Sequence, residues 1–274
     1  MGLRITTLSE NSASIEGCVG EWGLSVLVES DEANVLFDTG QSFSATHNAE
    51  LLGVDLKRVD KIVLSHGHFD HTGGLKNVLE KIGREIEIVA HPDIWQPKYG
   101  GLGERYIGIP FSREELEALG ARFKLTAEPT AIGPNIITSG EIPMVTDFET
   151  VELFLTVKQN GEYLHDPLRD DQALIIKTPS GLVVILGCAH RGIINTLYHA
   201  QKISGVTAID TVLGGCHLMS AGEARIRRTI AALRELGVKR LGACHCTGTE
   251  ALAMMAPEFG DSFIFNHAGT VLEL

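Results

Sequence analysis

Four side chains that commonly bind metal ions lie within one short segment of the chain: His66, His68, Asp70 and His71. Imidazole nitrogens and carboxylate oxygens suit zinc, iron or manganese. Alternate residues of an extended segment point to the same side, so His66 and His68 can share one ion. A turn at the following residues can direct Asp70 and His71 to a second ion nearby. The alternative is a solvated polar loop, which would have to collect four such donors by chance.

The segments on either side of this motif predict the elements that would hold it. Residues 61–65 are mostly apolar and predict a strand buried on both faces, which leads directly into His66. Gly73 and Gly74 follow the motif and open a predicted helix over residues 75–82. β-Branched and apolar runs bounded by turn residues predict further strands at 24–29, 34–38 and 85–90.

Residues 91–150 are rich in proline and are the least regular part of the sequence. Within them, Ser112 and Glu115 form a capping box, which predicts a short helix ending at Gly120. This region is either an elaboration that carries substrate-facing loops or a plain connection. The rest of the chain predicts a hairpin of residues 172–178 and 182–186, helices at 193–203, 223–236 and 250–256, and strands at 211–213 and 241–243.

This mixture of helices, hairpins and crossovers predicts an α/β fold in which two mixed sheets pack face to face with helices outside. The 274 residues are 44% hydrophobic, which suffices for one large domain. We therefore expect a single domain over residues 1–274, with a candidate loop-rich elaboration at 91–150. The sequence does not predict an oligomeric state.

Charge and cysteine content narrow the partners and the compartment. The formal charge of -12 disfavours nucleic acid as a partner. Five scattered cysteines argue against a disulfide framework, and no signal peptide or membrane-spanning run is expected from the sequence. The sequence thus favours a cytoplasmic protein without membrane partners.

The spacing of the four donors resembles the HxHxDH motif of the metallo-β-lactamase superfamily. The resemblance implies an αββα four-layer sandwich of two mixed sheets flanked by helices, with metals at the sheet edges. Residues 34–40 are similar to the early strand of that superfamily that ends in Asp-x-Gly. By this resemblance Asp38 supports the metal loop without binding metal itself, whereas a plain turn aspartate is the alternative.

Three further segments resemble one branch of the superfamily, the 7,8-dihydropterin-6-yl-methyl-4-(β-D-ribofuranosyl)aminobenzene-5′-phosphate synthase-like branch. They are Gly-Cys-Ala-His-Arg-Gly at 187–192, Gly-Gly-Cys-His-Leu at 214–218 and Cys-His-Cys-Thr-Gly at 244–248. The resemblance runs nearly end to end and includes Gly-Glu-Ile-Pro at 140–143 and Ala-Gly-Thr at 268–270.

The resemblance also assigns ligands in the second half of the chain. His245 matches the last metal histidine of the superfamily, and His190 stands where a ligand loop is expected. His217 is either a further ligand or a residue that supports a ligand or contacts substrate. One position departs from the pattern, because Cys188 stands where the superfamily places a metal-bridging aspartate. Cys188 is then either a thiolate ligand or a small buried residue, and occupancy of a second metal site is in question.

The implied cofactor is one or two divalent transition-metal ions, with zinc favoured and manganese or iron as alternatives. The branch resemblance implies that a small anionic substrate is condensed with loss of diphosphate from a pterin. The general site implies the alternative, hydrolysis of a phosphoester, thioester or lactone by metal-activated water. Asp70 is the candidate catalytic residue, on the hypothesis that it holds the second ion and orients attacking water.

Three other classes fit the sequence less well. An RNA-processing nuclease would need a basic surface, against which the net charge argues. A non-catalytic metal-binding protein would be expected to keep only part of the ligand set. An oxygen-reducing diiron protein of the superfamily typically carries a carboxylate where His68 stands, together with a flavin domain.

Overall fold

The computed structural model describes residues 2–274, and the chain forms two compact units. The first unit comprises the residues up to Ala127 together with Glu152–Asp170 and His267–Leu274. The second unit comprises Glu128–Val151 and Asp171–Asn266. The chain therefore returns to the first unit twice, and each unit is built from segments that are distant in sequence.

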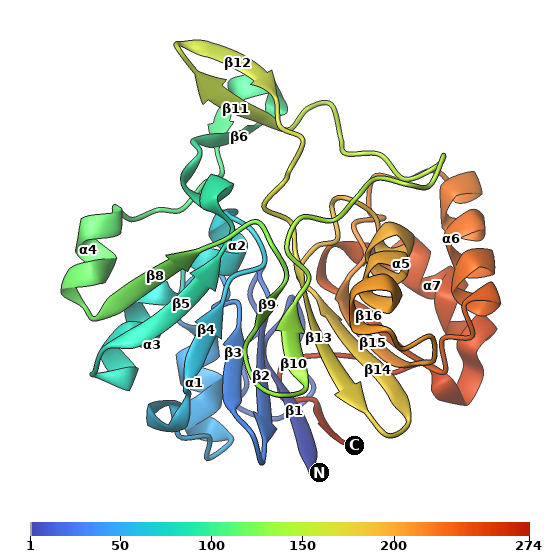
Figure 1. The fold of residues 1–274 in the computed structure, drawn as a ribbon, viewed down its shortest axis with the longest axis horizontal. Coiled ribbons are helices and arrows are strands. Elements are labelled where there is room, and N and C mark those ends of the chain that lie inside the picture. Colours follow the sequence, from blue (N-terminus) through green and yellow to red (C-terminus); the bar gives the residue numbers. More distant parts are fainter. Residues whose placement is uncertain (1) are drawn as a thin grey trace. The chain divides into compact units, whose positions relative to one another are not determined.

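The first unit contains a seven-stranded mixed sheet in the order β17-β1-β2-β3-β4-β5-β8. Strands β3, β4, β5 and β8 are parallel neighbours, whereas β17, β1, β2 and β3 pair in antiparallel fashion. The pairing of β1 with β17 brings the N- and C-terminal strands side by side (Figure 1). The strands are β1 (Leu3–Ser9), β2 (Ser25–Ser30), β3 (Asn34–Phe37), β4 (Lys61–Val63), β5 (Ile86–Ala90), β8 (Ala121–Leu125) and β17 (Val271–Glu273).

Helices α1, α3 and α4 pack on this sheet through an apolar core. In α3 the buried residues Leu75, Val78, Leu79 and Ile82 recur at helical spacing, which places one apolar face against the strands. Gly83, in the left-handed conformation, ends that helix. The helices are α1 (Ser44–Leu51), α2 (Phe69–Thr72), α3 (Leu75–Ile82) and α4 (Arg113–Ala118), with 3-10 turns η1 (Leu56–Arg58), η2 (Pro92–Trp95) and η3 (Gly101–Gly103).

A second, four-stranded sheet of the first unit has the order β12-β11-β6-β7 and lies at the top of Figure 1. Tyr99 contacts two other tyrosines of this sheet edge to face: its ring centroid lies 5.4 Å from that of Tyr106 and 5.0 Å from that of Tyr163. The strands are β6 (Lys98–Gly100), β7 (Arg105–Tyr106), β11 (Thr156–Gln159) and β12 (Glu162–His165).

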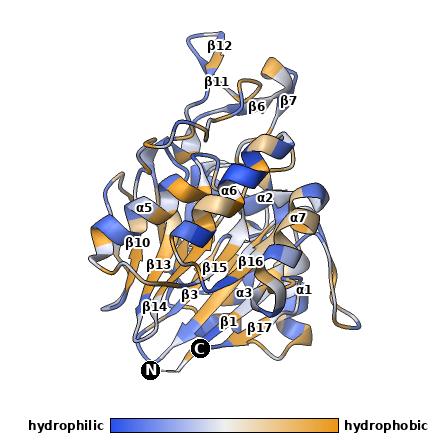
Figure 2. Ribbon diagram, turned by 90° about the vertical axis from the view of Figure 1, so that its right-hand side faces the viewer, coloured by the Kyte–Doolittle hydropathy of each residue, from blue (hydrophilic) through white to orange (hydrophobic). Residues whose placement is uncertain are grey.

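The second unit contains a six-stranded mixed sheet in the order β16-β15-β14-β13-β10-β9. Strands β14, β15 and β16 are parallel, and α5, α6 and α7 cover this sheet through a second apolar core. In Figure 2 these strands are mostly hydrophobic, whereas α6 shows both hydrophilic and hydrophobic residues. The elements are β9 (Thr130–Ala131), β10 (Ile136–Thr138), β13 (Ala173–Thr178), β14 (Gly181–Leu186), α5 (Ile193–Ser204), β15 (Ile209–Gly215), α6 (Glu223–Glu235), β16 (Arg240–Cys244), η4 (His245–Thr247), α7 (Thr249–Phe259) and η5 (Gly260–Ser262).

The predicted elements are confirmed to within a few residues at each end, including the helix over residues 75–82 and the hairpin of β13 and β14. The capping box of Ser112 and Glu115 is present at the start of α4. Residues 91–150 contain β6, β7, α4, β8, β9 and β10, and the single-domain organisation stays a prediction. Within residues 2–274, no helix is long and apolar enough to cross a membrane.

Candidate functional site

The carboxylate of Asp38 anchors the segment that carries the predicted metal donors of the first unit. Strands β3 and β4 are parallel neighbours, so Asp38, which follows β3, reaches Ser65, which follows β4. Oδ1 of Asp38 accepts a hydrogen bond from the amide of Ser65 (2.7 Å), and Oδ2 accepts one from its hydroxyl (2.7 Å). Oδ2 also lies 2.7 Å from Nδ1 of His71. Asp38, Ser65 and His71 are all fully buried.

These contacts determine which nitrogen of each histidine can bind a metal. A carboxylate only accepts hydrogen bonds, so Nδ1 of His71 must donate to Asp38 and Nε2 keeps its lone pair. The hydroxyl proton of Ser65 is used on Asp38, and Nδ1 of His66 lies 2.8 Å from that hydroxyl oxygen. His66 therefore donates from Nδ1 as well, which leaves its Nε2 as an acceptor. Carboxylates commonly orient metal-binding histidines in this way.

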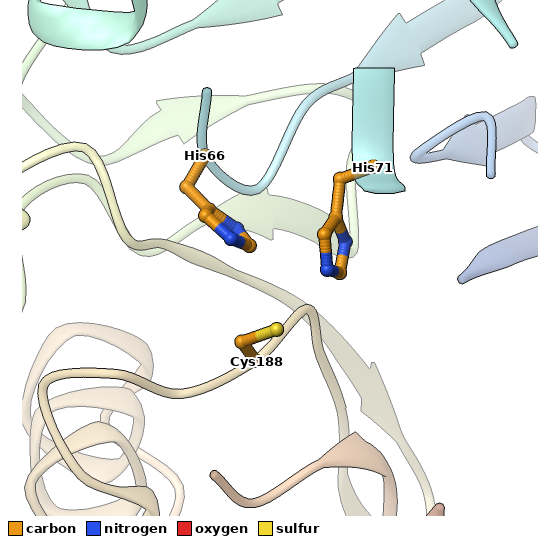
Figure 3. Close-up of side chains that lie close together, drawn as sticks. All are labelled: His66, His71 and Cys188. Carbon is orange, nitrogen blue, oxygen red and sulfur yellow. The ribbon is translucent and has the colours of Figure 1, made fainter. Parts of the chain in front are cut away.

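Within each of two pairs, the donor atoms lie close enough together to share a metal ion. Nε2 of His66 is 3.0 Å from Nδ1 of His68, and Nε2 of His71 is 3.8 Å from Oδ2 of Asp70. Ligands about 2.0–2.1 Å from a tetrahedral zinc ion are separated by about 3.3 Å. Figure 3 shows the rings of His66, from the loop after β4, and His71, from α2, facing the same side, and their centroids are 4.3 Å apart. The residues of the first unit thus fit a transition-metal ion.

Burial keeps His68 in the form that binds metal. It is 6% exposed, and its pKa is lowered to about 3, first by burial and then by the charge of Lys98, although Asp70 and Asp170 act in the opposite direction. The imidazole is therefore neutral near pH 7, and a neutral imidazole has the lone pair that a metal needs.

Two glycines allow the backbone of this segment to pack tightly. A Cβ on Gly67 would lie 2.4 Å from the carbonyl oxygen of Ile94, and one on Gly74 would lie 1.9 Å from that of Thr39. Real Cβ atoms do not approach backbone oxygens so closely, so a side chain at either position would displace the loop. The glycines thus place the donor segment directly against neighbouring backbone.

A buried cluster of one lysine and two aspartates also supports the segment that carries the predicted metal donors of the first unit. Nζ of Lys98 donates to Asp166 and Asp170 (2.8 Å each), and the second oxygen of Asp170 accepts a hydrogen bond from the amide of Gly67 (2.8 Å). Lys98 has no exposed surface, and both aspartates are buried. Burial alone would lower the pKa of Lys98, but the charges and hydrogen bonds of Asp170 and Asp166 raise it above the ordinary value. The lysine is therefore an ammonium ion that holds Asp170 against the metal loop.

In the second unit, donors follow the carboxyl ends of the parallel strands β14, β15 and β16. The structure brings together Cys188, His190 and His217 as one group and Cys188, His245 and Cys246 as another. In each group the ligand atoms lie within 4.8 Å of one another. Figure 3 shows Cys188 in the loop that follows β14. Nitrogen and thiolate donors at this spacing fit a transition-metal ion.

The buried thiols of this unit differ in their ionisation. Burial opposes ionisation of Cys246, but hydrogen bonding with Cys188 and His217 and the charge of His245 lower its pKa well below the ordinary value. Burial raises the pKa of Cys216 to about 12. A metal ligand must be the thiolate, so Cys246 is the better suited of the two.

Two carboxylates hold the donor loop after β14. Asp171 accepts a hydrogen bond from the amide of Arg191 (2.9 Å). Glu149 accepts from the amides of Ile194 (2.9 Å) and Asn195 (2.8 Å), at the start of α5. Asn195 in turn accepts from the amides at 145 and 146, so the motif at 140–143 lies next to a segment fastened to this helix. Burial raises the pKa of Glu149, and the two amides counteract it.

The predicted site residues therefore form one set in each unit. The first contains His66, His68, Asp70 and His71 with Asp38 beneath them, and the second contains Cys188, His190, His217 and His245. Sequence reasoning missed Cys246, although it flanks His245 in the motif at 244–248. It also missed Lys98, Asp166 and Asp170, for which the local sequence carries no signal.

Helices on a mixed sheet in each unit, with candidate metal donors at the ends of parallel strands, define an α/β protein whose side chains could hold a metal ion. The family model of the metallo-β-lactamase superfamily matches residues 23–245. The chain belongs to this superfamily, which confirms the predicted family and fold class and implies binding of divalent metal.

Relatives with known names cover the whole chain. It is 36% identical to 7,8-dihydropterin-6-methyl-4-(β-D-ribofuranosyl)-aminobenzene-5′-phosphate synthase of Methanocaldococcus jannaschii, over 99% of this chain and 96% of that protein. It is 35% identical to Tm1679, a metal-dependent hydrolase of the β-lactamase superfamily, with a TM-score of 0.87 and 99% of each chain covered. The fold is shared with YhfI of Bacillus subtilis (TM-score 0.60, 16% identity, 100% and 99% covered).

Replacing Asp38 with Asn should weaken metal binding by about 10–100-fold, because an amide no longer forces both histidines to present their Nε2 lone pairs. Competition with a chromophoric chelator measures this. Asp60→Asn is the control, because Asp60 also accepts from a backbone amide, that of Asn34 (2.8 Å), but lies at the other end of these strands. Equal affinities of the wild type and Asp38→Asn would contradict the prediction.

Lys98→Met should lower the free energy of unfolding of the metal-free protein by about 3–5 kcal/mol, because it leaves buried carboxylates without a counter-charge. The double substitution with Asp170→Asn should cost less than the sum of the two single ones. Urea unfolding measures all three variants. Lys61→Met, which removes a partly exposed ion pair with Glu87, should change stability by at most about 1 kcal/mol. Additive costs in the double variant would show that the two groups act independently.

Proposed function

We propose that the protein catalyses a metal-dependent condensation on a dihydropterin, in which an arylamine ribose phosphate displaces diphosphate from a pterin methyl diphosphate. The observation that carries this proposal is the 36% identity to the named synthase, which extends over 99% of this chain and 96% of that protein. Coverage of this extent supports transfer of the reaction better than the family match alone.

We infer that His66, His68, Asp70 and His71 bind metal in the first unit and that His190 and His245 bind metal in the second, as the resemblance to the superfamily implies. The donor chemistry within each unit supports this inference. One or two divalent ions would be held, and the nitrogen and sulfur donors favour zinc over manganese or iron. Cys188 and His217 are further candidate ligands. When bound, the ions supply Lewis acidity that neutralises the charge of the leaving diphosphate.

The proposed reaction balances without an external oxidant or reductant. The arylamine nitrogen forms a bond to the pterin methylene carbon while the bond from that carbon to the diphosphate oxygen breaks. The nitrogen loses one proton, and diphosphate leaves with the bonding electron pair. Asp70, which is 7% exposed at the start of α2, is proposed to hold metal and to orient the attacking group.

Arg105 is proposed to bind a phosphate group of the substrate. Its side chain is exposed, and its guanidinium carbon lies 5.1 Å from the ring centroid of Phe69, which stands between His68 and Asp70. The amide of Phe69 donates a hydrogen bond to the carbonyl oxygen of Ile107 (2.9 Å). Ile107 follows β7, which contains Arg105, so this part of the chain is held against the segment that carries the predicted metal donors. Within residues 2–274, no carboxylate pairs with Arg105, and its charge remains available for an anion.

Hydrolysis is the second candidate, and the similarity to Tm1679 favours it, because that protein is called a metal-dependent hydrolase and covers 99% of this chain. The same donors could activate water for attack on a phosphoester, thioester or lactone. The substrate would again be small and anionic, and the cytoplasmic location and the lack of a nucleic-acid partner remain part of the proposal.

The deciding experiment incubates the metal-loaded protein with a pterin methyl diphosphate, with and without the arylamine ribose phosphate, beside a panel of phosphodiesters, thioesters and lactones. We expect diphosphate release that requires the amine and yields a carbon–nitrogen adduct. Asp70→Ala should abolish turnover while losing only part of the metal, whereas His66→Ala and His245→Ala should both lose metal. Amine-independent release of pterin alcohol would favour the hydrolase, and full metal retention in both histidine variants would refute the ligand assignment.

Arg105→Gln should weaken binding of phosphate-bearing substrates by about 10-fold or more, because a charge-assisted hydrogen bond contributes about 1.5–3 kcal/mol. Inhibition by inorganic diphosphate measures this without a turnover assay. Arg113→Gln is the matched control, because Arg113 also lies over a ring, but that ring belongs to Phe123 outside the motif and Arg113 pairs with Glu117. Equal inhibition of wild type and Arg105→Gln would refute the role.

A further inference from the structure

Two cysteines converge at the carboxyl edge of the parallel strands in the second unit. Cys188 follows β14, and Cys246 lies in η4 after β16; each is 3% exposed. Their ligand atoms lie within 4.8 Å of each other and of a nitrogen of His245. Sγ of Cys246 is 3.6 Å from the carbonyl oxygen of Cys188, so the two loops are in direct contact. Three soft or borderline donors thus meet in one buried place.

The backbone leaves room for the sulfur of Cys246. A Cβ on Gly215, the last residue of β15, would lie 2.6 Å from Sγ of Cys246, so only glycine allows the sulfur to lie there. The backbone of His245 adopts a left-handed conformation (φ 54°), which residues other than glycine rarely take. Such strain concentrates where the position of a side chain matters for function.

We propose that Cys188 and Cys246 bind a divalent transition-metal ion as thiolates, together with His245. The set goes beyond the ligands of the proposed function, because it adds Cys246, assigns Cys188 as a thiolate ligand beside it and so makes this part of the centre soft. Two thiolates and a neutral imidazole balance the charge of a divalent ion, which lowers the cost of burying it. Sulfur donors select zinc, or cobalt and iron in its place, over magnesium and calcium.

The other buried cysteines of this edge serve as internal comparisons. Cys216 and Cys244 are as buried as the proposed ligands, at 1% and 2% exposure. Neither belongs to a group of converging donors among residues 2–274. The sulfur of Cys244 lies 3.3 Å from the side-chain nitrogen of Asn266, which donates to it. A cysteine that only packs in the core would behave like these two.

Cobalt substitution tests the proposal in the full-length protein. Cobalt bound by thiolate gives a sulfur-to-metal charge-transfer band in the near ultraviolet, which nitrogen and oxygen ligands do not produce. We expect this band in the wild type, a loss of about half of it in Cys188→Ser and in Cys246→Ser, and its absence in the double variant. Cys216→Ser and Cys244→Ser should keep the full band. An unchanged band in Cys246→Ser would overturn the proposal.

X-ray absorption at the zinc edge gives a second measurement that needs no variant. Two sulfurs at about 2.3 Å beside nitrogen or oxygen at about 2.0–2.1 Å would support the set. One sulfur or none would overturn it. This outcome is separate from the reaction, since turnover could persist with a sulfur-free centre, and sulfur coordination could be found in a protein that does not act on pterins.

Discussion

A buried carboxylate must have its oxygens hydrogen-bonded, and among residues 2–274 Asp38 meets this requirement through the segment that carries the predicted metal donors of the first unit. The same bonds that satisfy Asp38 fix Ser65 and orient His71, and through Ser65 they orient His66. Stability and ligand geometry are therefore not separable at this position. A change at Ser65 or His71 removes hydrogen bonds that the buried carboxylate needs, and a change of Asp38 itself removes the group that orients the imidazoles.

Carboxylates also position the predicted ligand segment of the second unit. There they accept hydrogen bonds from backbone amides rather than from imidazole rings. Asp171 and Glu149 accept from amides of the loop after β14 and of the first turn of α5. The amides of Ile194 and Asn195 would otherwise be unsatisfied at the start of α5, and the helix dipole favours an acidic group such as Glu149 there. The ligand loops of both units are thus set by buried anions that do not have to touch metal themselves.

The sequence predicts the contiguous part of this arrangement and fails for the rest. The four donors of the first unit lie within six consecutive positions: His66, His68, Asp70 and His71. Their residue types and the period of the backbone therefore suffice to place them together. Apolar periodicity likewise predicts α3 and the hairpin of β13 and β14. Lys98 is separated from Asp166 and Asp170 by 68 and 72 positions, and nothing near it distinguishes it from a surface lysine. Only the tertiary fold brings such ion clusters together.

The prediction missed Cys246 for a different reason. Its neighbour His245 already explained the motif at 244–248, and a cysteine at this position could equally have filled space in the core. What distinguishes it is the backbone around it. Ala189, His217 and His245 all have positive φ (53°, 46° and 54°) at turns that follow β14, β15 and β16. A left-handed residue other than glycine costs about 1–2 kcal/mol. Glycine would remove that strain at His217 and His245 but would also remove a candidate metal donor at each position.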